Sequence, residues 1–499
     1  MAPPFRKILI ANRGEIAVRV ARACREMGIA AAAVFSEADR DSLHVRYADE
    51  AYPIGPAAPA ESYLSIERVM DAARRAGAEA IHPGYGFLSE NPRFAEACEN
   101  AGVIFIGPPA AAMRLMGNKV EARRQMKAAG VPITPGSDGP VASAGDVEKA
   151  ASALGYPILI KAAAGGGGRG MRVVRARKEI DSALAACRSE AGSAFGDPSV
   201  YVERYWDRVR HIEVQVLADA CGHTVHLGER ECSIQRRHQK LIEESPSPLL
   251  DEAARERLGA AAVRACEAIG YRSAGTVEFL ADAQGGFWFM EVNARLQVEH
   301  PVTEMVTGID LVRAQIRIAA GEDPGLRQEG IRMRGAAIEC RLCSEDPDND
   351  FLPSPGRIDR LRVPGGPGVR DDSGVYEGYV MPPYYDSLFS KLIVWGADRR
   401  EAIERMRRCL DEYVVEGIPT TLPFHRRVID DPRFVSGDLH TRFIEEMKGG
   451  APAPEPSGPM EDLAAIAVAL DRSAAVAPPR PPAEGWKHAG RRRQLEKRT

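Results

Sequence analysis

The 499-residue chain has no long hydrophobic run. Its most apolar stretches, such as AAVRACEAIG (261–270), are interrupted by charge well before the roughly 20 residues that a membrane-spanning helix needs. An excess of one charge is also absent, because 66 Lys and Arg stand against 70 Asp and Glu and give a net charge of −4. No basic stripe favours nucleic acid. We therefore expect neither a membrane nor a nucleic acid among the partners of this chain.

Regular cysteine spacing is missing as well. The nine cysteines are an odd number at irregular intervals, and the chain opens MAPPFRKILI rather than with a charged, apolar and small-residue signal. These features predict a reduced, cytoplasmic setting. The single CxxC motif, from Cys340 to Cys343, has no second pair to complete a zinc site, so we interpret both cysteines as structural.

The length predicts about three domains, since one domain commonly takes roughly 150 residues. Residues 1–117 alternate short β-rich runs with helical patterns, beginning with RKILIA (6–11), a helical segment closed by Gly28, and IAAAAVF (29–35). Strands recurring at this spacing are typical of βαβ units. The sequence therefore predicts a parallel sheet covered by helices.

The pattern of β-rich and helical segments changes after residue 117. Residues 118–331 contain paired β-rich runs separated by turn residues, which favours an α+β region. Residues 332–448 carry the short strand candidates GAAIECRL, GRIDRLRV and SKLIVWG with two charged helices, and we expect a third unit there. Residues 449–499 are rich in Pro and Ala around one helix candidate, MEDLAAIAVALDR, and end in a basic segment. They are predicted to be a linker and tail.

Four consecutive glycines lie in KAAAGGGGRGM (161–171). The letters GGGGRG satisfy G-x-G-x-x-G, but that dinucleotide motif needs a strand before it and a helix after it, whereas here both flanks are β-rich. A P-loop is also excluded, because no Gly-Lys pair occurs in the chain. We interpret the glycines as a hairpin turn whose bare amides, with Lys161 and Arg169, suit a polyphosphate beneath a movable flap. A surface turn with incidental charge is the alternative.

A second predicted hairpin, TVEFLADAQGGFWFMEVN, carries two glutamates. If its turn is centred on Gln284 and Gly285, Glu278 and Glu291 lie opposite each other, about 5 Å apart at Cβ. Facing carboxylates repel unless a cation lies between them. A hard divalent ion such as Mg²⁺ is predicted, with Asn293 adding a carbonyl oxygen. In the alternative, one glutamate points to solvent beyond a bulge.

Polar residues are dense among apolar ones in ERECSIQRRHQKLIEE and RLQVEHPVTEM, which is typical of a lined cleft. Together with IANRGEIAVRV, IHPGYGFLSEN, KAAAGGGGRGM, and FLPSPGRI with MPPYYDS, these segments resemble biotin carboxylase of the ATP-grasp superfamily, in unbroken order from about residue 5 to 446. The resemblance implies an α/β and α+β multidomain fold. Its parts would be an N-terminal Rossmann-like α/β domain (1–117), an ATP-grasp domain (118–331) with a glycine-rich lid at about 133–205, and a C-terminal mixed α/β domain (332–448).

The same resemblance implies the residues of the site. Nucleotide contacts are expected at Lys119, Lys161, Gly167, Gly168, Glu203, Arg204, Tyr205, Trp206, His211, Gln235 and His238. A metal, Mg²⁺ or Mn²⁺, is expected at Glu278, Glu291 and Asn293. The bicarbonate pocket would comprise Lys240, Arg295, Gln297 and Val298, with Glu299 as general base, Arg341 as the cation facing biotin, and Tyr85 and Gly86 near the entering biotin. Arg204, Trp206 and Ala294 depart from residues common in the family.

The implied activity is the ATP-dependent carboxylation of biotin with bicarbonate through carboxyphosphate, the first half-reaction of an acyl-CoA carboxylase. The segment EEMKGG lacks the alanine and second methionine of the Ala-Met-Lys-Met attachment motif. Biotin would therefore be carried as a substrate on a separate biotin carboxyl carrier protein, with a carboxyltransferase on another chain, and the family implies a homodimer. The sequence does not indicate which acyl-CoA the complete enzyme carboxylates. The alternatives are another ATP-grasp carboxylate ligase and a catalytically inactive nucleotide-binding subunit.

Overall fold

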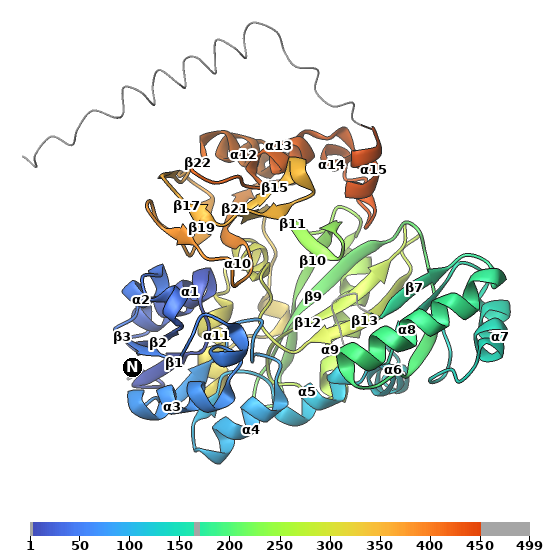
Figure 1. Ribbon diagram of the computed structural model, residues 1–499, viewed down its shortest axis with the longest axis horizontal. Helices are drawn as coiled ribbons and strands as arrows, with labels where there is room; N and C mark the ends of the chain where they lie inside the picture. The colour runs from blue at the N-terminus through green and yellow to red at the C-terminus, as the bar shows by residue number, and fades with distance from the viewer. Residues whose placement is uncertain (1–2, 164–169, 451–499) are drawn as a thin grey trace, which may run out of the picture. The chain divides into compact units, whose positions relative to one another are not determined.

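The computed structural model describes residues 3–163 and 170–450 (Figure 1). Met1–Glu445 form one compact unit, and the second unit, Glu446–Thr499, is described only as far as residue 450. The helix candidate MEDLAAIAVALDR and nearly all of the predicted tail thus lie outside the described residues. Within the described ranges, no helix combines the length and the apolar character that crossing a membrane requires.

A five-stranded sheet forms the N-terminal region, and its order is β3-β2-β1-β4-β5. Every neighbouring pair is parallel, as the alternating pattern predicts. Helix α1 stops just before Gly28, whose φ of 71° is left-handed and suits glycine. Figure 1 shows these elements in blue. They are β1 (Lys7–Ile10), α1 (Gly14–Glu26), β2 (Ala30–Phe35), α2 (Leu43–Tyr47), β3 (Glu50–Pro53), α3 (Ile66–Ala76), β4 (Ala80–His82), α4 (Pro92–Asn100) and β5 (Ile104–Phe105).

A three-stranded antiparallel sheet, β7-β6-β8, holds the flanks of the glycine motif. Lys161 on β6 lies opposite Met171 on β7, so the segment between them joins a hairpin, as the sequence predicts. Gly167, Gly168 and Arg169 themselves lie outside the described residues. The helices and strands of this part of the chain are α5 (Ala110–Gly117), α6 (Lys119–Ala128), α7 (Ala144–Leu154), β6 (Ile158–Ala162), β7 (Met171–Val174), α8 (Ile180–Phe195) and β8 (Val200–Arg204).

The largest sheet among the described residues has eight antiparallel strands. Its order is β13-β12-β9-β10-β11-β14-β21-β19. It crosses the predicted boundary at 331/332, because β11 pairs with β14 and places Glu243 opposite Glu339. The central and C-terminal regions therefore share one sheet. Its strands and adjoining helices are β9 (Arg210–Ala218), β10 (Thr224–Arg236), β11 (Gln239–Ser245), α9 (Glu252–Ala268), β12 (Ser273–Ala281), β13 (Phe287–Asn293), α10 (His300–Thr307), α11 (Leu311–Ala319), β14 (Ala336–Cys343), β19 (Val369–Ser373) and β21 (Leu388–Gly396).

The C-terminal region differs from its prediction in one strand and in its helices. GRIDRLRV is not one strand, because Ile358 N–H donates to Tyr379 O while Asp359 N–H donates to Glu416 O, so the chain changes partner between them. Four helices occur where two were expected. The remaining elements are β15 (Glu345–Asp346), β16 (Leu352–Pro353), β17 (Gly356–Arg357), β18 (Arg360–Arg362), β20 (Val380–Met381), α12 (Arg399–Glu412), β22 (Val414–Glu416), α13 (Leu422–Asp430), α14 (Pro432–Ser436) and α15 (Phe443–Gly450).

Candidate active site

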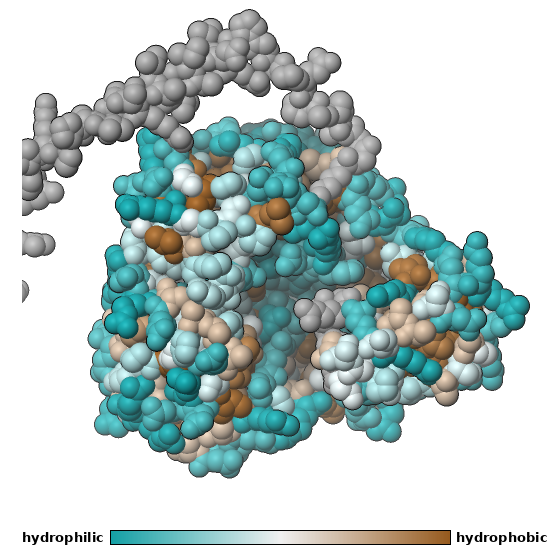
Figure 2. Space-filling model, viewed as in Figure 1, coloured by the Kyte–Doolittle hydropathy of each residue, from teal (hydrophilic) through white to brown (hydrophobic). Residues whose placement is uncertain are grey.

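A cavity of about 1220 Å³ is lined by residues of the N-terminal, central and C-terminal regions. Figure 2 shows a hydrophilic hollow in the middle of the visible face. Of the site residues that the sequence predicts and the structure describes, all but one line this cavity. They are Tyr85, Gly86, Lys119, Lys161, Glu203, Arg204, Tyr205, Trp206, His211, Gln235, His238, Lys240, Glu278, Glu291, Asn293, Arg295, Gln297, Val298 and Arg341. The exception, Glu299, is fully buried in contact with two of these residues.

The hairpin of β12 and β13 places Glu278 opposite Glu291, as predicted. The predicted turn centre is wrong, however, because the register shifts after Glu278 and Phe279 pairs with Phe289. With a bulge at residue 290, the turn comprises residues 282–286 and is centred on Gln284, and the Asp282 carboxylate accepts the N–H groups of residues 284 and 286. The bulge adds one residue to β13 between the turn and Glu291. This extra residue offsets the shift of the turn centre, so Glu278 still pairs with Glu291.

The metal candidates offer oxygen ligands of the kind that Mg²⁺ prefers. Glu291 keeps 31% of its side chain exposed and has Lys119 Nζ 3.3 Å from its Oε2. Asn293 Oδ1 accepts from Arg295 Nη2 at 3.2 Å, while its Nδ2 has no partner among the described residues. The two facing carboxylates and this buried amide fit a hard divalent cation, which Glu278, Glu291 and Asn293 could hold.

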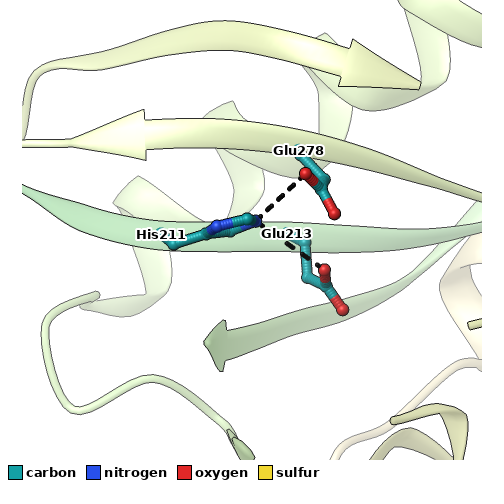
Figure 3. Close-up of side chains that lie close together, drawn as sticks. All are labelled: His211, Glu213 and Glu278. Atoms are coloured by element: carbon teal, nitrogen blue, oxygen red, sulfur yellow. Dashed lines mark ion pairs between the residues drawn. The ribbon is translucent and has the colours of Figure 1, made fainter. Parts of the chain in front are cut away.

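His211 and Glu213 lie beside Glu278, one of these candidates (Figure 3). His211 Nε2 lies 3.2 Å from Glu278 Oε2 and 4.0 Å from Glu213 Oε2. His211 and Glu213 share one face of β9, since side chains alternate along a strand. The structure therefore adds Glu213 to the residues that the sequence singles out.

Lys240 joins three buried carboxylates. Its Nζ lies 2.5 Å from Glu213, 2.8 Å from Glu278 and 2.7 Å from Glu299. Burial alone would lower the pKa of Lys240, but these carboxylates raise the pKa well above its ordinary value. Burial likewise favours the neutral form of Glu299, yet Lys240, Arg341 and Arg230 hold the pKa of Glu299 well below the usual carboxyl range. Both groups are charged at neutral pH.

Lys119 and Lys161 line the end of the cavity formed by β6 and β7. Lys161 Nζ lies 3.4 Å from Glu203 Oε2, and Arg123 Nη1 lies 2.6 Å from the other oxygen of Glu203. Burial and the neighbouring Lys161 lower the pKa of Lys119. Burial opposes the charge of Lys161, but Glu203 raises its pKa. A lysine pair that repels itself is suited to an anionic ligand such as a polyphosphate.

Trp206 forms an aromatic wall with Trp288, whose ring it stacks against at a centroid distance of 4.4 Å. The guanidinium of Arg204 lies 5.8 Å from the Trp206 ring. Arg204 is exposed, and its Nη1 also donates to Leu154 O at 3.4 Å. All three departures, Arg204, Trp206 and Ala294, line the cavity; the Trp206 ring packs on Trp288, whereas the Arg204 side chain is exposed.

Arg295 and Arg341 occupy the other end of the cavity. Arg295 Nε donates to Glu90 Oε2 at 3.0 Å, and its Nη1 donates to Gln297 Oε1 at 2.9 Å. Arg341 Nε donates to Glu243 Oε1 at 2.6 Å, and its Nη2 donates to Glu299 Oε2 at 2.8 Å. Both guanidinium groups are thus held by carboxylates at the edge of the cavity.

Sequence reasoning missed Glu213, Glu243 and Arg230. Arg230 is fully buried and donates to Glu213, which in turn contacts Lys240. One signal was available for Glu213, because HIEVQV alternates polar and apolar residues, as a strand with a polar buried face does. Nothing in the local pattern identifies Arg230 as the partner of Glu213, since they lie on different strands.

Three family profiles match the chain: the N-terminal domain of biotin carboxylase over residues 4–113, the ATP-binding domain of the carbamoyl-phosphate synthase L chain over 118–326, and the C-terminal domain of biotin carboxylase over 339–446. A pyruvate carboxylase subunit of Methanothermobacter thermautotrophicus is 56% identical over 449 residues, covering 90% of this chain and 91% of the relative. The biotin carboxylase of Nostoc sp. is 57% identical over 443 residues, covering 89% of this chain and 99% of the relative.

Solved structures are similar over the same extent. A complex of biotin carboxylase with β,γ-ATP from Campylobacter jejuni has a TM-score of 0.86 at 50% identity, covering 89% of this chain and 99% of that one. The biotin carboxylase domain dimer of Hydrogenobacter thermophilus 2-oxoglutarate carboxylase, in complex with MgADP, ADP and bicarbonate, has a TM-score of 0.86 at 49% identity, covering 90% and 99%. The mixed α/β fold expected from the sequence is confirmed by these likenesses.

Proposed function

The chain belongs to the biotin carboxylase family, and we propose that its described side chains divide the ATP-dependent carboxylation of biotin among three parts of one cavity. The observation that carries this division is the position of Lys240, which contacts Glu278 on one side and Glu299 on the other. Glu299 in turn contacts Arg341. One continuous set of charges thus links the metal candidates to the end of the cavity assigned to biotin.

ATP is proposed to bind between Lys161 and the aromatic wall. Lys119 and Lys161 would face its phosphates, and Gly167 and Gly168, which lie outside the described residues, stay proposed nucleotide contacts. His211, Gln235 and His238 line the same cavity, and the segment 203–206 would contact the adenine. Mg²⁺, or Mn²⁺ in its place, bound at Glu278, Glu291 and Asn293 would neutralise charge on the transferred phosphoryl group.

Bicarbonate is proposed to bind beside Lys240, Arg295, Gln297 and the backbone of Val298. Glu299 is the proposed base, and its low pKa keeps it ionised but makes it a weak base while its cationic partners are in place. When Lys240 and Arg341 turn towards anionic substrates, Glu299 loses two of its cationic partners and becomes more basic. The deprotonated bicarbonate then attacks the γ-phosphate, the bond to ADP breaks, and carboxyphosphate forms.

Biotin is proposed to enter beside Tyr85 and Gly86. Carboxyphosphate breaks down to carbon dioxide and phosphate, and the phosphate takes the ureido proton of biotin. Arg341 would stabilise the negative charge that develops on the ureido oxygen. The ureido nitrogen then attacks carbon dioxide and gives carboxybiotin.

The proposed carrier and carboxyltransferase follow from the reaction, and the proposed homodimer follows from the family. We propose that biotin arrives on a separate carrier protein, that a carboxyltransferase on another chain uses the product, and that two copies of this chain form a homodimer. An acyl-CoA is the proposed acceptor, although relatives of this chain serve pyruvate and 2-oxoglutarate carboxylases. A reducing compartment such as the cytoplasm is the proposed location, supported by nine cysteines without a disulfide.

The decisive experiment measures ATP cleavage by the full chain with Mg²⁺ and bicarbonate, with and without free biotin. Stimulation by biotin with formation of carboxybiotin is expected. ATP cleavage that ignores both bicarbonate and biotin would contradict the proposal and favour another ATP-grasp ligase. Absence of any cleavage would favour an inactive nucleotide-binding subunit.

A further inference from the structure

Glu339 is a buried acid that the proposed reaction does not use. It lies on β14 with 0% of its surface exposed. Neither of its carboxyl oxygens has a hydrogen-bond partner among the described residues. An ionised carboxylate in such a place is strongly disfavoured, so a buried group of this kind calls for an explanation.

Glu243 faces Glu339 from the neighbouring strand. The two residues are directly paired in the register of β11 and β14. Glu243 Oε1 accepts from Arg341, while Oε2 of Glu243 has no partner among the described residues. A protonated Glu339 can donate to such an oxygen, whereas two ionised carboxylates at paired positions repel each other. The arrangement fits one proton shared by two acids.

The charged groups around this pair come from each element that packs against it. Arg341 lies on β14 itself, Lys240 on β11 and Lys391 on β21, and Glu299 precedes α10. Lys391 is already held by Glu15 of α1 at 3.0 Å and donates to Val298 O at 2.8 Å. His300, at the start of α10, is neutral because burial, and then Lys391, lower its pKa well below its ordinary value.

Neither Arg341 nor Lys391, the two cations that act on Glu339, is free to neutralise it. Arg341 serves Glu243 and Glu299, and Lys391 serves Glu15. Burial raises the pKa of Glu339 well above its ordinary value, against the opposing effect of Lys391, and Glu243 raises it further. Burial also raises the pKa of Glu243 to about 7, although Arg341 opposes the change. The electrostatics agree with the geometry of the pair.

We propose that Glu243 and Glu339 share one proton at neutral pH, and that this proton leaves Arg341 free to turn from Glu299 to an anionic substrate. If Glu339 lost the proton, a third carboxylate would draw the guanidinium back into the protein and repel the substrate anion. Glu339 is thus a positioning residue that acts through Arg341. The inference rests on the proposed placement of biotin beside Arg341.

The pH dependence of kcat/KM for free biotin tests this role, measured from about pH 6 to about pH 9. The unsubstituted enzyme is expected to lose kcat/KM at the alkaline end as the pair loses its proton. Glu339→Gln copies the protonated acid and cannot ionise, so at the alkaline end it is expected to exceed the unsubstituted enzyme by about threefold or more. Superimposable profiles, or a folded Glu339→Gln protein inactive at every pH, would overturn the proposal.

Asp371 provides a matched control. It is a carboxyl on β19 of the same sheet whose pKa burial raises to about 6, and it bonds to Ser390 and Tyr413 rather than to Arg341. Asp371→Asn is expected to keep the alkaline loss of the unsubstituted enzyme. If Asp371→Asn abolishes that loss as Glu339→Gln does, the effect is not specific to the pair and the proposal is wrong.

Infrared difference spectroscopy tests the proton without any reaction. The unsubstituted protein at neutral pH is expected to show a protonated-carboxyl band that shifts in D₂O and is missing from Glu339→Gln. A spectrum unchanged by the substitution overturns the shared proton even if the enzyme carboxylates biotin. Failure of the proposed function would instead appear as an unsubstituted enzyme that ignores biotin while the band is present.

Discussion

Nζ of Lys240 donates to Oε1 of Glu299 across 2.7 Å. The same ammonium, on β11, contacts Glu278, a candidate metal ligand on β12. A single side chain therefore connects a candidate metal ligand with the proposed base.

Lys240→Gln is expected to lower the bicarbonate-dependent ATPase rate by about 100-fold or more, because a preorganised cation facing the reacting anions is removed. Steady-state ATP cleavage over a range of bicarbonate concentrations measures the change. Lys127→Gln is the control, since Lys127 is exposed and contacts only Asp138 among the ion pairs described. An unaltered bicarbonate dependence in Lys240→Gln would rule out the role of Lys240.

Arg341→Ala is expected to abolish biotin carboxylation while ATP affinity stays within about threefold, because the guanidinium contacts Glu243 and Glu299 rather than the proposed nucleotide residues. Carboxybiotin formation and calorimetric ATP binding are measured on the same preparation. Loss of both in equal proportion would mean that Arg341 supports the whole cavity instead of the biotin end.

Glu291→Gln is expected to raise the Mg²⁺ concentration for half-maximal ATPase by about tenfold or more, since a neutral amide replaces a charged oxygen ligand. A chelator should abolish cleavage by the unsubstituted enzyme, and added Mg²⁺ should restore it. Glu322→Gln serves as control because Glu322 pairs with Arg317 outside the cavity. Identical Mg²⁺ curves for the two variants would remove Glu291 from the metal site.

Acid is expected to destabilise the fold between about pH 6.5 and about pH 4 through buried neutral histidines. Burial lowers the pKa of His44 and of His425 to about 4, and that of His82 to about 3. The unfolded chain binds protons at these histidines in that window and the folded chain does not, so the free energy of unfolding falls as the pH falls. Each histidine costs about 2 kcal/mol at about pH 5.

Urea denaturation at about pH 7 and about pH 5 measures this loss. His44→Gln should show a smaller decrease than the unsubstituted protein, because one of the proton-binding groups is gone from the unfolded chain. An equal decrease in both proteins would show that His44 already binds a proton in the folded state.

The sequence by itself determined the elements whose signal is local. Alternating strands and helices predicted the parallel sheet, which is confirmed, because each βαβ unit carries its own periodicity. The hairpin pattern predicted Glu278 opposite Glu291, and this pairing is confirmed because the bulge at residue 290 offsets the misplaced turn centre. The motifs that resemble biotin carboxylase also indicated the family, because each motif is a continuous stretch of sequence.

Tertiary structure alone decided which distant strands became neighbours. Side-chain alternation tells which residues share a face of one strand, but not which other strand lies beside it. The pairing of β11 with β14 placed Glu243 against Glu339 and carried one sheet across the predicted boundary at 331/332. The three carboxylates around Lys240 likewise come from separate elements. Their contact depends on long-range packing, which no local pattern in the sequence records.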